Sequence, residues 1–295
     1  MRVVPEDLFV ITGSRFAVEV ARQLVAIDPR LATQLILEPA PRSTCAAIAL
    51  GISWAQQRGA QPNDVFFVAT ADHLINPEEA FGAVLDAAQP FARAGNLVVF
   101  GVTPTRAETG FGYIQAGDAV NGAFHVRRFV EKPNLATAES YLEKGSYFWN
   151  AGMFAFTASA FHHAVEQHLP PLSQALSQGL AMLLDQFAAL PNISIDYALL
   201  EKSDKVVVLP LNLSWIDVGS WENVYELLSK DANANAFQGQ VVALDTRNSL
   251  VLGGKRLIAT VGIEDLIIID TPEALLVAKR SDAQKVKTLV ESLPR

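Results

Sequence analysis

Cysteine is almost absent from this sequence, which carries one, Cys45, in 295 residues. A single thiol cannot form a disulfide within the chain, and such a composition fits a reducing compartment better than a disulfide-stapled secreted domain. We therefore expect a cytoplasmic protein in which Cys45 is a small buried apolar residue.

Positive charge is also scarce, since 23 Lys and Arg face 31 Asp and Glu and leave a formal net charge of -8. Nucleic acid and anionic membranes attract proteins with a positive field, so neither is an expected partner. Long apolar runs are missing as well. Runs such as residues 65–69 and 97–100 are far shorter than the roughly 20 residues of a membrane span, and they indicate buried strands.

The first two-thirds of the chain alternates short apolar runs with longer amphipathic segments, which is typical of strands covered by helices on both faces. We predict strands at 8–11, 35–37, 65–69 and 97–102. Helices are expected from Ser14, over 44–58 and over 77–94, and the first of these should bury Phe16, Val20, Leu24 and Ile27. The pattern predicts an α/β fold whose loops meet at the carboxyl edge of a sheet.

The sequence pattern changes in the last quarter of the chain. Short β-rich runs are separated there by turn-forming residues, and the runs are 241–244, 250–252, 257–261, 266–269 and 275–278. This pattern predicts a small β unit, solenoid-like in its spacing, that ends in a helix over 282–293. The polar stretch 229–235 is the expected linker. The expected domains are therefore 1–230 and 236–295.

Two aspartates are candidate metal ligands. Asp72 follows a predicted buried strand, and Asp217 lies between Trp215 and Trp221 in a glycine-containing loop. Two carboxylates with substrate phosphate oxygens suit Mg²⁺, although an aspartate at either position also commonly caps a helix or a turn.

Three further segments carry polar residues where a ligand could bind. Glu131 and Lys132 precede Pro133, which favours an extended backbone that directs the lysine, and a strand end in solvent is the plain alternative. The segment 108–113 has two glycines that allow close approach to a ligand, or it is an ordinary hairpin. The segment 38–44 precedes a helix start, where a heterocycle or an anion could bind. Asn150 is the one polar residue of an aromatic run.

Taken in this order, the segments resemble the mannose-1-phosphate guanylyltransferases within the larger family of hexose-1-phosphate nucleotidyltransferases. The matching stretches are 38–44, 71–73, 104–114, 129–133, 149–154, 194–197 and 217–221, and they extend over nearly the whole chain. The resemblance implies a doubly wound, Rossmann-like nucleotidyltransferase domain of the α/β class with a small C-terminal β-helix-like unit. It implies that GTP and mannose 1-phosphate give GDP-mannose and pyrophosphate.

The resemblance also implies roles for individual residues. Asp72 and Asp217 would hold Mg²⁺, and Lys132 would bind the sugar phosphate. The sugar would be contacted by Glu131 and Asn150 and approached by Gly110, with Glu108 in the same segment. The guanine would be faced by Glu38, Arg42, Ser43 and Thr44.

One family motif has no counterpart in the sequence, namely the opening glycine-rich loop of the form G-G-x-G-x-R-L with the catalytic lysine that follows it. We therefore expect an N-terminally truncated transferase domain, weak or no turnover by this polypeptide alone, and exposed strand edges that favour aggregation or a partner. The partner could be a second copy or a complete paralogue. A noncatalytic sugar-nucleotide-binding subunit and another nucleotide or hexose specificity are the alternatives.

Overall fold

The computed structural model describes residues 4–292, without the side chain of Glu291. Met1 and Leu293, the expected end of the last helix, lie outside these residues. Internal contacts divide the chain into two units. The first comprises Met1–Thr70 and Ile75–Ser214, and the second comprises Ala71–Leu74 and Trp215–Arg295.

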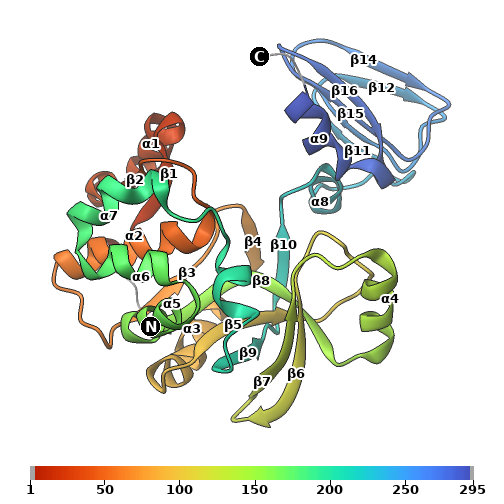
Figure 1. Cartoon of the computed structure of the whole chain (residues 1–295). Helices are drawn as coiled ribbons and strands as arrows, with labels where there is room; N and C mark the ends of the chain where they lie inside the picture. The colour runs from red at the N-terminus through yellow and green to blue at the C-terminus, as the bar shows by residue number, and fades with distance from the viewer. Residues whose placement is uncertain (1–3, 293–295) are drawn as a thin grey trace. The chain divides into compact units, whose positions relative to one another are not determined.

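A six-stranded mixed sheet forms the centre of the first unit (Figure 1). Its order is β3 (Val65–Val68), β8 (Tyr147–Thr157), β5 (Leu97–Val102), β9 (Val206–Pro210), β7 (Ala123–Val130) and β6 (Tyr113–Val120). Within it β5 and β9 are parallel, whereas β8 runs antiparallel to both β3 and β5. The parallel arrangement typical of alternating strands and helices is therefore interrupted by β8, an almost wholly buried apolar strand.

Both faces of this sheet are covered. Neighbouring residues of a strand point to opposite sides of the sheet, so a single strand contributes side chains to both layers. Leu97 and Val99 of β5 join a core shared with residues of α2 (Ser43–Gln57), α5 (Ala158–His168), α6 (Pro170–Ser177) and α7 (Leu180–Gln186). Phe100 instead packs on Phe67, and Phe67 packs on Phe81 of α3 (Glu78–Arg93). A shorter helix, α4 (Leu135–Lys144), contacts β8, and Asp196–Leu200 form a π-helical turn.

The N-terminal elements differ in part from expectation. A parallel pair joins β1 (Val10–Gly13) to β2 (Leu35–Glu38), separate from the main sheet. The helix expected from Ser14 begins as a 3₁₀ turn, and α1 covers Ala17–Ile27 without a side-chain cap. The predicted buried face of this helix was wrong, since Phe16 is 49% and Ile27 77% exposed and only Leu24 is buried. The apolar residues of this helix recur at helical spacing, but the part of the chain that the structure describes does not cover all of them.

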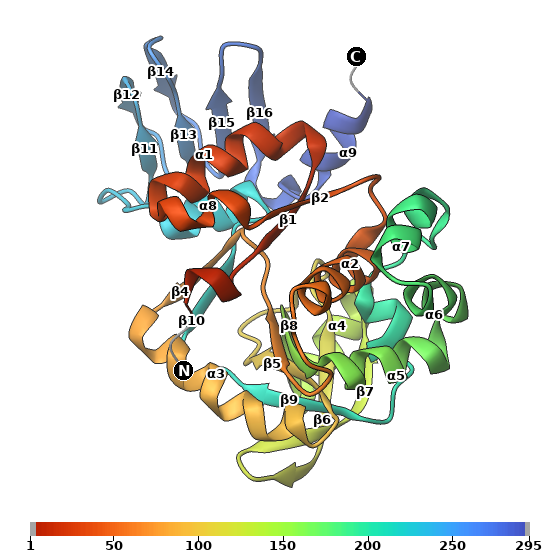
Figure 2. The same cartoon turned by 90° about the vertical axis from the view of Figure 1, so that its left-hand side faces the viewer.

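The second unit contains stacked β strands (Figure 2). One sheet has the order β11 (Ala236–Gln238), β13 (Leu250–Leu252), β15 (Leu266–Asp270) and β16 (Leu275–Lys279), and a second pairs β12 (Val241–Leu244) with β14 (Ile258–Val261). The pairs β11–β13, β13–β15 and β12–β14 are parallel and recur along the chain, as in a β-helix. The expected C-terminal β-helix-like unit is confirmed in this respect.

Helices and polar contacts complete the second unit. Arg280, which precedes α9 (Lys285–Ser292), donates to Glu222 of α8 (Trp221–Leu227) and stacks over the ring of Tyr225. Within residues 229–235, expected as a linker, Asp231 accepts from the backbone amides of Asn233 and Asn235 and stabilises a turn. Asn235 is buried and donates to the carbonyl of Thr246. The remaining strands, β4 (His73–Asn76) and β10 (Ser214–Asp217), pair with each other.

None of the helices in residues 4–292 combines the length and apolar character that a membrane crossing requires.

Candidate functional site

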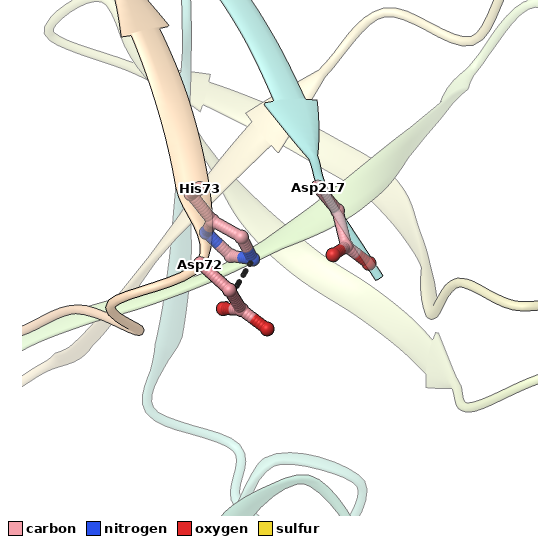
Figure 3. A group of neighbouring side chains, drawn as sticks. All are labelled: Asp72, His73 and Asp217. Atoms are coloured by element: carbon pink, nitrogen blue, oxygen red, sulfur yellow. Dashed lines mark ion pairs between the residues drawn. The ribbon is translucent and has the colours of Figure 1, made fainter. Parts of the chain in front are cut away.

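Two carboxylates and an imidazole come together in the second unit (Figure 3). Asp72 immediately precedes β4, His73 begins it, and Asp217 ends β10. One potential ligand atom from each of these residues lies within 4.8 Å of the others. The two aspartates predicted as metal ligands are thus neighbours, although 145 positions separate them in the sequence.

Local backbone contacts orient Asp217. Its Oδ1 accepts from the amide of Gly219 at 2.7 Å, and its carbonyl accepts from the side chain of Asn223 at 2.5 Å. A Cβ atom at position 219 would lie 2.8 Å from Oδ1, so a larger residue there would displace the Asp217 carboxylate. The amide of Val218 donates to the carbonyl of Asp72 at 3.0 Å and ties the two aspartate segments together.

His73 is held from the side away from the carboxylates. Its Nδ1 accepts from the indole N–H of Trp215 at 3.2 Å, and its Nε2 lies 3.9 Å from Oδ1 of Asp72. Burial lowers the pKa of His73, and the charges of Asp217 and Asp72 offset part of that effect. Because Nδ1 accepts a hydrogen bond, the imidazole of this structure is the neutral form.

The donor set fits a hard divalent cation. Mg²⁺ is usually bound by one or two carboxylates and completes its shell with water and substrate phosphate oxygens. Asp72 is 63% exposed, so an ion has access to its oxygens. The Asp217 carboxylate has two oxygens that can accept, and the amide of Gly219 fixes the direction of one of them.

A second polar group lies in the first unit, where the turn after β7, the strand β8 and the π-helical turn contribute side chains. We call Glu131, Lys132, Asn150 and Asp196 the carboxylate–lysine cluster. The Nζ atom of Lys132 is 3.4 Å from Oε1 of Glu131, and the amide nitrogen of Asn150 donates to Oδ1 of Asp196 at 2.9 Å. Glu201 accepts from the backbone amide of Glu131 at 3.1 Å.

Glu131 is the most perturbed acid of this cluster. Burial raises its pKa to about 7, the negative charge of Asp196 adds to the effect, and Lys132 opposes it. Its Oε2 is buried without a hydrogen-bond partner among the described residues. A Cβ atom at Gly112 would overlap this oxygen, so the carboxylate lies directly against the glycine backbone. A buried acceptor with unused capacity is costly unless a ligand or water pairs with it.

The neighbours of Glu131 are fixed in unusual ways. The extended backbone predicted for Lys132 was wrong: its φ is 48°, in the left-handed region, and its amide donates to the carbonyl of Phe111 at 3.3 Å. For a residue other than glycine such a conformation is uncommon, and it is found preferentially at functional sites. Asn150 is 9% exposed and uses its side-chain oxygen to accept from Gly152 at 3.2 Å. Burial also raises the pKa of Asp196.

Other predicted residues make contacts with the protein itself. Glu108 accepts from the amide of Gly110 at 3.0 Å and pairs with Arg106, so it holds its own loop. Arg42 donates to the carbonyl of Ala188, and Thr44 accepts from the amide of Ile195 at 2.9 Å.

The remaining two residues predicted to face the base lie at element ends. Ser43 begins α2 with a left-handed φ of 62°, and Glu38 ends β2 with a pKa that burial raises. The bond from Ile195 to Thr44 joins the segment predicted around guanine to the residue before Asp196.

Sequence reasoning missed four participants. Asp196 lay in a noted stretch, 194–197, without an assigned role, and His73 and Trp215 stood beside predicted ligands. The contact between His73 and Trp215 joins residues that are 142 positions apart, which no local sequence pattern indicates. Gly112 was one of two glycines in its segment, and Gly110 was chosen instead.

The comparison with known families accounts for both units. The family described as nucleotidyl transferase matches residues 1–234, and the MannoseP isomerase/GMP-like beta-helix domain matches residues 239–293. The chain therefore belongs to the nucleotidyl transferase family, with a C-terminal β-helix-like unit. Members of this family generally use a divalent metal ion.

Individual curated proteins show which members of the family this chain is similar to. Over 303 residues the chain is 38% identical to a mannose-1-phosphate guanylyltransferase of Escherichia coli (strain K12), an alignment that covers 98% of this chain and 63% of the relative. It is 39% identical to the xanthan biosynthesis protein XanB of Xanthomonas campestris pv. campestris (strain B100), with 95% and 60% covered. The chain thus spans less than two-thirds of these curated relatives.

A solved structure shares the fold over nearly the whole chain. The crystal structure of mannose-1-phosphate geranyltransferase from Thermus thermophilus is 33% identical with a TM-score of 0.86, and the match covers 97% of this chain and 84% of that one. This likeness confirms the expected fold class.

Proposed function

We propose that the chain transfers guanylyl from GTP to mannose 1-phosphate and releases GDP-mannose and pyrophosphate. The names of its relatives support this activity. The observation that carries the proposal is the pairing of Glu131, whose buried Oε2 has no partner among the described residues, with the directed cation of Lys132. An acceptor for a sugar hydroxyl beside a cation for a phosphate suits a sugar phosphate.

The proposed roles in the first unit begin with the carboxylate–lysine cluster. Lys132 binds the phosphate of the sugar, and Glu131 accepts from a hydroxyl group. Asn150 has one amide hydrogen beyond the one donated to Asp196, and that hydrogen can reach the sugar. The proposed remaining contacts are made to the sugar by the loop of Glu108 and Gly110 and to guanine by Glu38, Arg42, Ser43 and Thr44.

In the second unit, Asp72 and Asp217 are the proposed ligands of Mg²⁺. When bound, the ion neutralises phosphate charge and supports departure of pyrophosphate. The protein contributes positioning and charge for the in-line attack of a sugar phosphate oxygen on the α-phosphorus, and no covalent nucleophile is required.

The setting of the enzyme follows from the same proposal. The proposed location is the cytoplasm, because a chain with a single cysteine fits a reducing compartment, and neither nucleic acid nor membrane is a proposed partner. We propose a transferase domain over 1–230 and a β-rich unit over 236–295. Association with a second copy or with a complete paralogue stays a prediction.

Two alternative functions predict different behaviour. A noncatalytic regulatory subunit would bind GDP-mannose without forming it, and an enzyme of other specificity would prefer UTP or dTTP with glucose 1-phosphate. The names of the relatives favour guanylyl transfer to mannose over both.

The test is product formation by the purified chain with each nucleotide and each sugar phosphate in Mg²⁺, followed by chromatography of the nucleotide sugars. We expect GDP-mannose from GTP and mannose 1-phosphate, and about 10² to 10³-fold less product for Lys132→Met. Lys144→Met is the control, because this residue ends α4 and pairs with none of the cluster residues. Binding of GDP-mannose without any product would favour the regulatory reading, and a UDP-sugar or dTDP-sugar would favour the other specificity.

A further inference from the structure

The contact between Trp215 and His73 decides which imidazole nitrogen carries the proton. An indole N–H can only donate, and that of Trp215 points to Nδ1 of His73 at 3.2 Å. The two rings are nearly perpendicular, with centroids 5.1 Å apart. Nδ1 must therefore offer its lone pair, and it carries no proton.

A neutral imidazole has one N–H, so the proton of His73 lies on Nε2. This nitrogen is the one nearer to Asp72, at 3.9 Å from its Oδ1 (Figure 3). The His73 side chain is only 8% exposed, which leaves the ring little freedom to turn over. Protonated Nε2 has no lone pair for a cation.

Histidines that bind metals show the opposite arrangement. Such a histidine donates its second ring N–H to a carboxylate, a carbonyl or water, which leaves the first nitrogen free to coordinate the ion. In this protein the second nitrogen faces a donor, so coordination by Nε2 would force a proton onto Nδ1, directly against the indole N–H of Trp215.

We infer that Trp215 fixes His73 as an N–H donor toward the oxygens around Asp72 and Asp217, so that the metal centre offers the ion oxygen ligands only. This inference rests on the proposed metal site. Oxygen ligands suit Mg²⁺ and Mn²⁺, whereas an added imidazole would favour Zn²⁺ and other transition metals. Trp215 and His73 are thus positioning residues that set the choice of metal, and they do not coordinate it.

The first test is the tautomer of His73, measured without metal or nucleotide. Long-range ¹H–¹⁵N spectra of the labelled chain distinguish the two neutral tautomers, and the spectrum of His73→Gln identifies the signals of His73 among the five histidines. We expect the proton on Nε2. A proton on Nδ1 would overturn the inference, and this outcome is independent of whether the chain has transferase activity.

The second test is the choice of metal. Pulsed EPR of the Mn²⁺-loaded chain should show no coupling to a histidine nitrogen, and a coupling that disappears in His73→Gln would refute the proposal. Trp215→Phe removes the indole donor, so His73 can carry its proton on Nδ1 and coordinate an ion through Nε2. Zn²⁺ affinity measured by titration should therefore rise at least about tenfold. The double variant with His73→Gln should lose this gain.

Trp221→Phe is the matched control, because it removes a neighbouring tryptophan that begins α8, and it should leave Zn²⁺ affinity unchanged. If Zn²⁺ affinity rose equally in this control, the gain would come from a general loosening of the fold around the site. That result would contradict the role of Trp215. If Trp215→Phe does not fold, the tautomer in the unaltered chain still decides.

Discussion

The pKa of Glu131 predicts how stability depends on pH. Its folded value is about 7 against an ordinary 4.5, with burial as the main cause. Between these values the unfolded chain releases the proton and the folded chain retains it, so stability is fully present below about pH 4.5 and falls as pH rises through 7. At about 1.4 kcal/mol per pH unit between 4.5 and about 7, the total loss is at most about 3.5 kcal/mol.

Glu131→Gln keeps the shape of the side chain and removes the charge. We expect the variant to gain about 2 to 3 kcal/mol in free energy of unfolding over the unaltered chain between pH 5 and pH 8.5, because only the latter must bury a carboxylate at the higher pH. Urea unfolding followed by circular dichroism at the two pH values measures the difference. Glu139→Gln, an exposed residue of α4, is the control and should shift stability equally at both. A stability difference for Glu131→Gln that does not change with pH would refute the reasoning.

Three other substitutions test separate parts of the structure. Gly112→Ala places a methyl group on the buried carboxylate beside it and should weaken GDP-mannose binding about tenfold by calorimetry, whereas Gly82→Ala, which meets no neighbour, should not. Asp217→Asn should lower Mn²⁺ affinity at least tenfold by titration, and unchanged affinity would exclude this residue as a ligand. Arg280→Leu should lower the free energy of unfolding by about 2 kcal/mol, since it breaks a half-buried ion pair, while Arg22→Leu, which breaks an exposed ion pair, should leave it nearly unchanged.

Much of the fold could be predicted from local patterns. The strand Leu97–Val102 was predicted to the residue, and α2 and α3 lie within one residue of their predicted ends. Apolar periodicity and turn residues suffice for such elements because each element's own sequence carries the signal. The same is true of the short runs of the C-terminal unit.

Other elements depend on contacts that a local pattern does not contain. The run Tyr147–Thr157 is a central antiparallel strand, a placement set by its partners on both sides. Ala236–Gln238 form a strand directly after a stretch rich in Asp and Asn. In that stretch Asp231 accepts from the backbone amide of Asn235, and the buried side chain of Asn235 donates to the carbonyl of Thr246. Polarity predicted a linker here, but it could not show which side chains bond to the backbone within the stretch.

The predicted site residues differ in how many of their hydrogen-bonding atoms are already paired within the protein. Sequence alone could not show this difference. Arg42 and Thr44 donate to or accept from the backbone of residues 188 and 195, and Glu108 accepts from Gly110, so part of their capacity serves the fold. Glu131 differs, because its Oε2 is buried, has no partner among residues 4–292 and lies against a glycine. Since an unpaired buried carboxylate oxygen destabilises the folded state, its retention is best explained by a ligand that supplies the missing donor. A sugar hydroxyl is such a donor, and the adjacent Lys132 supplies the charge that a phosphate on the same sugar requires.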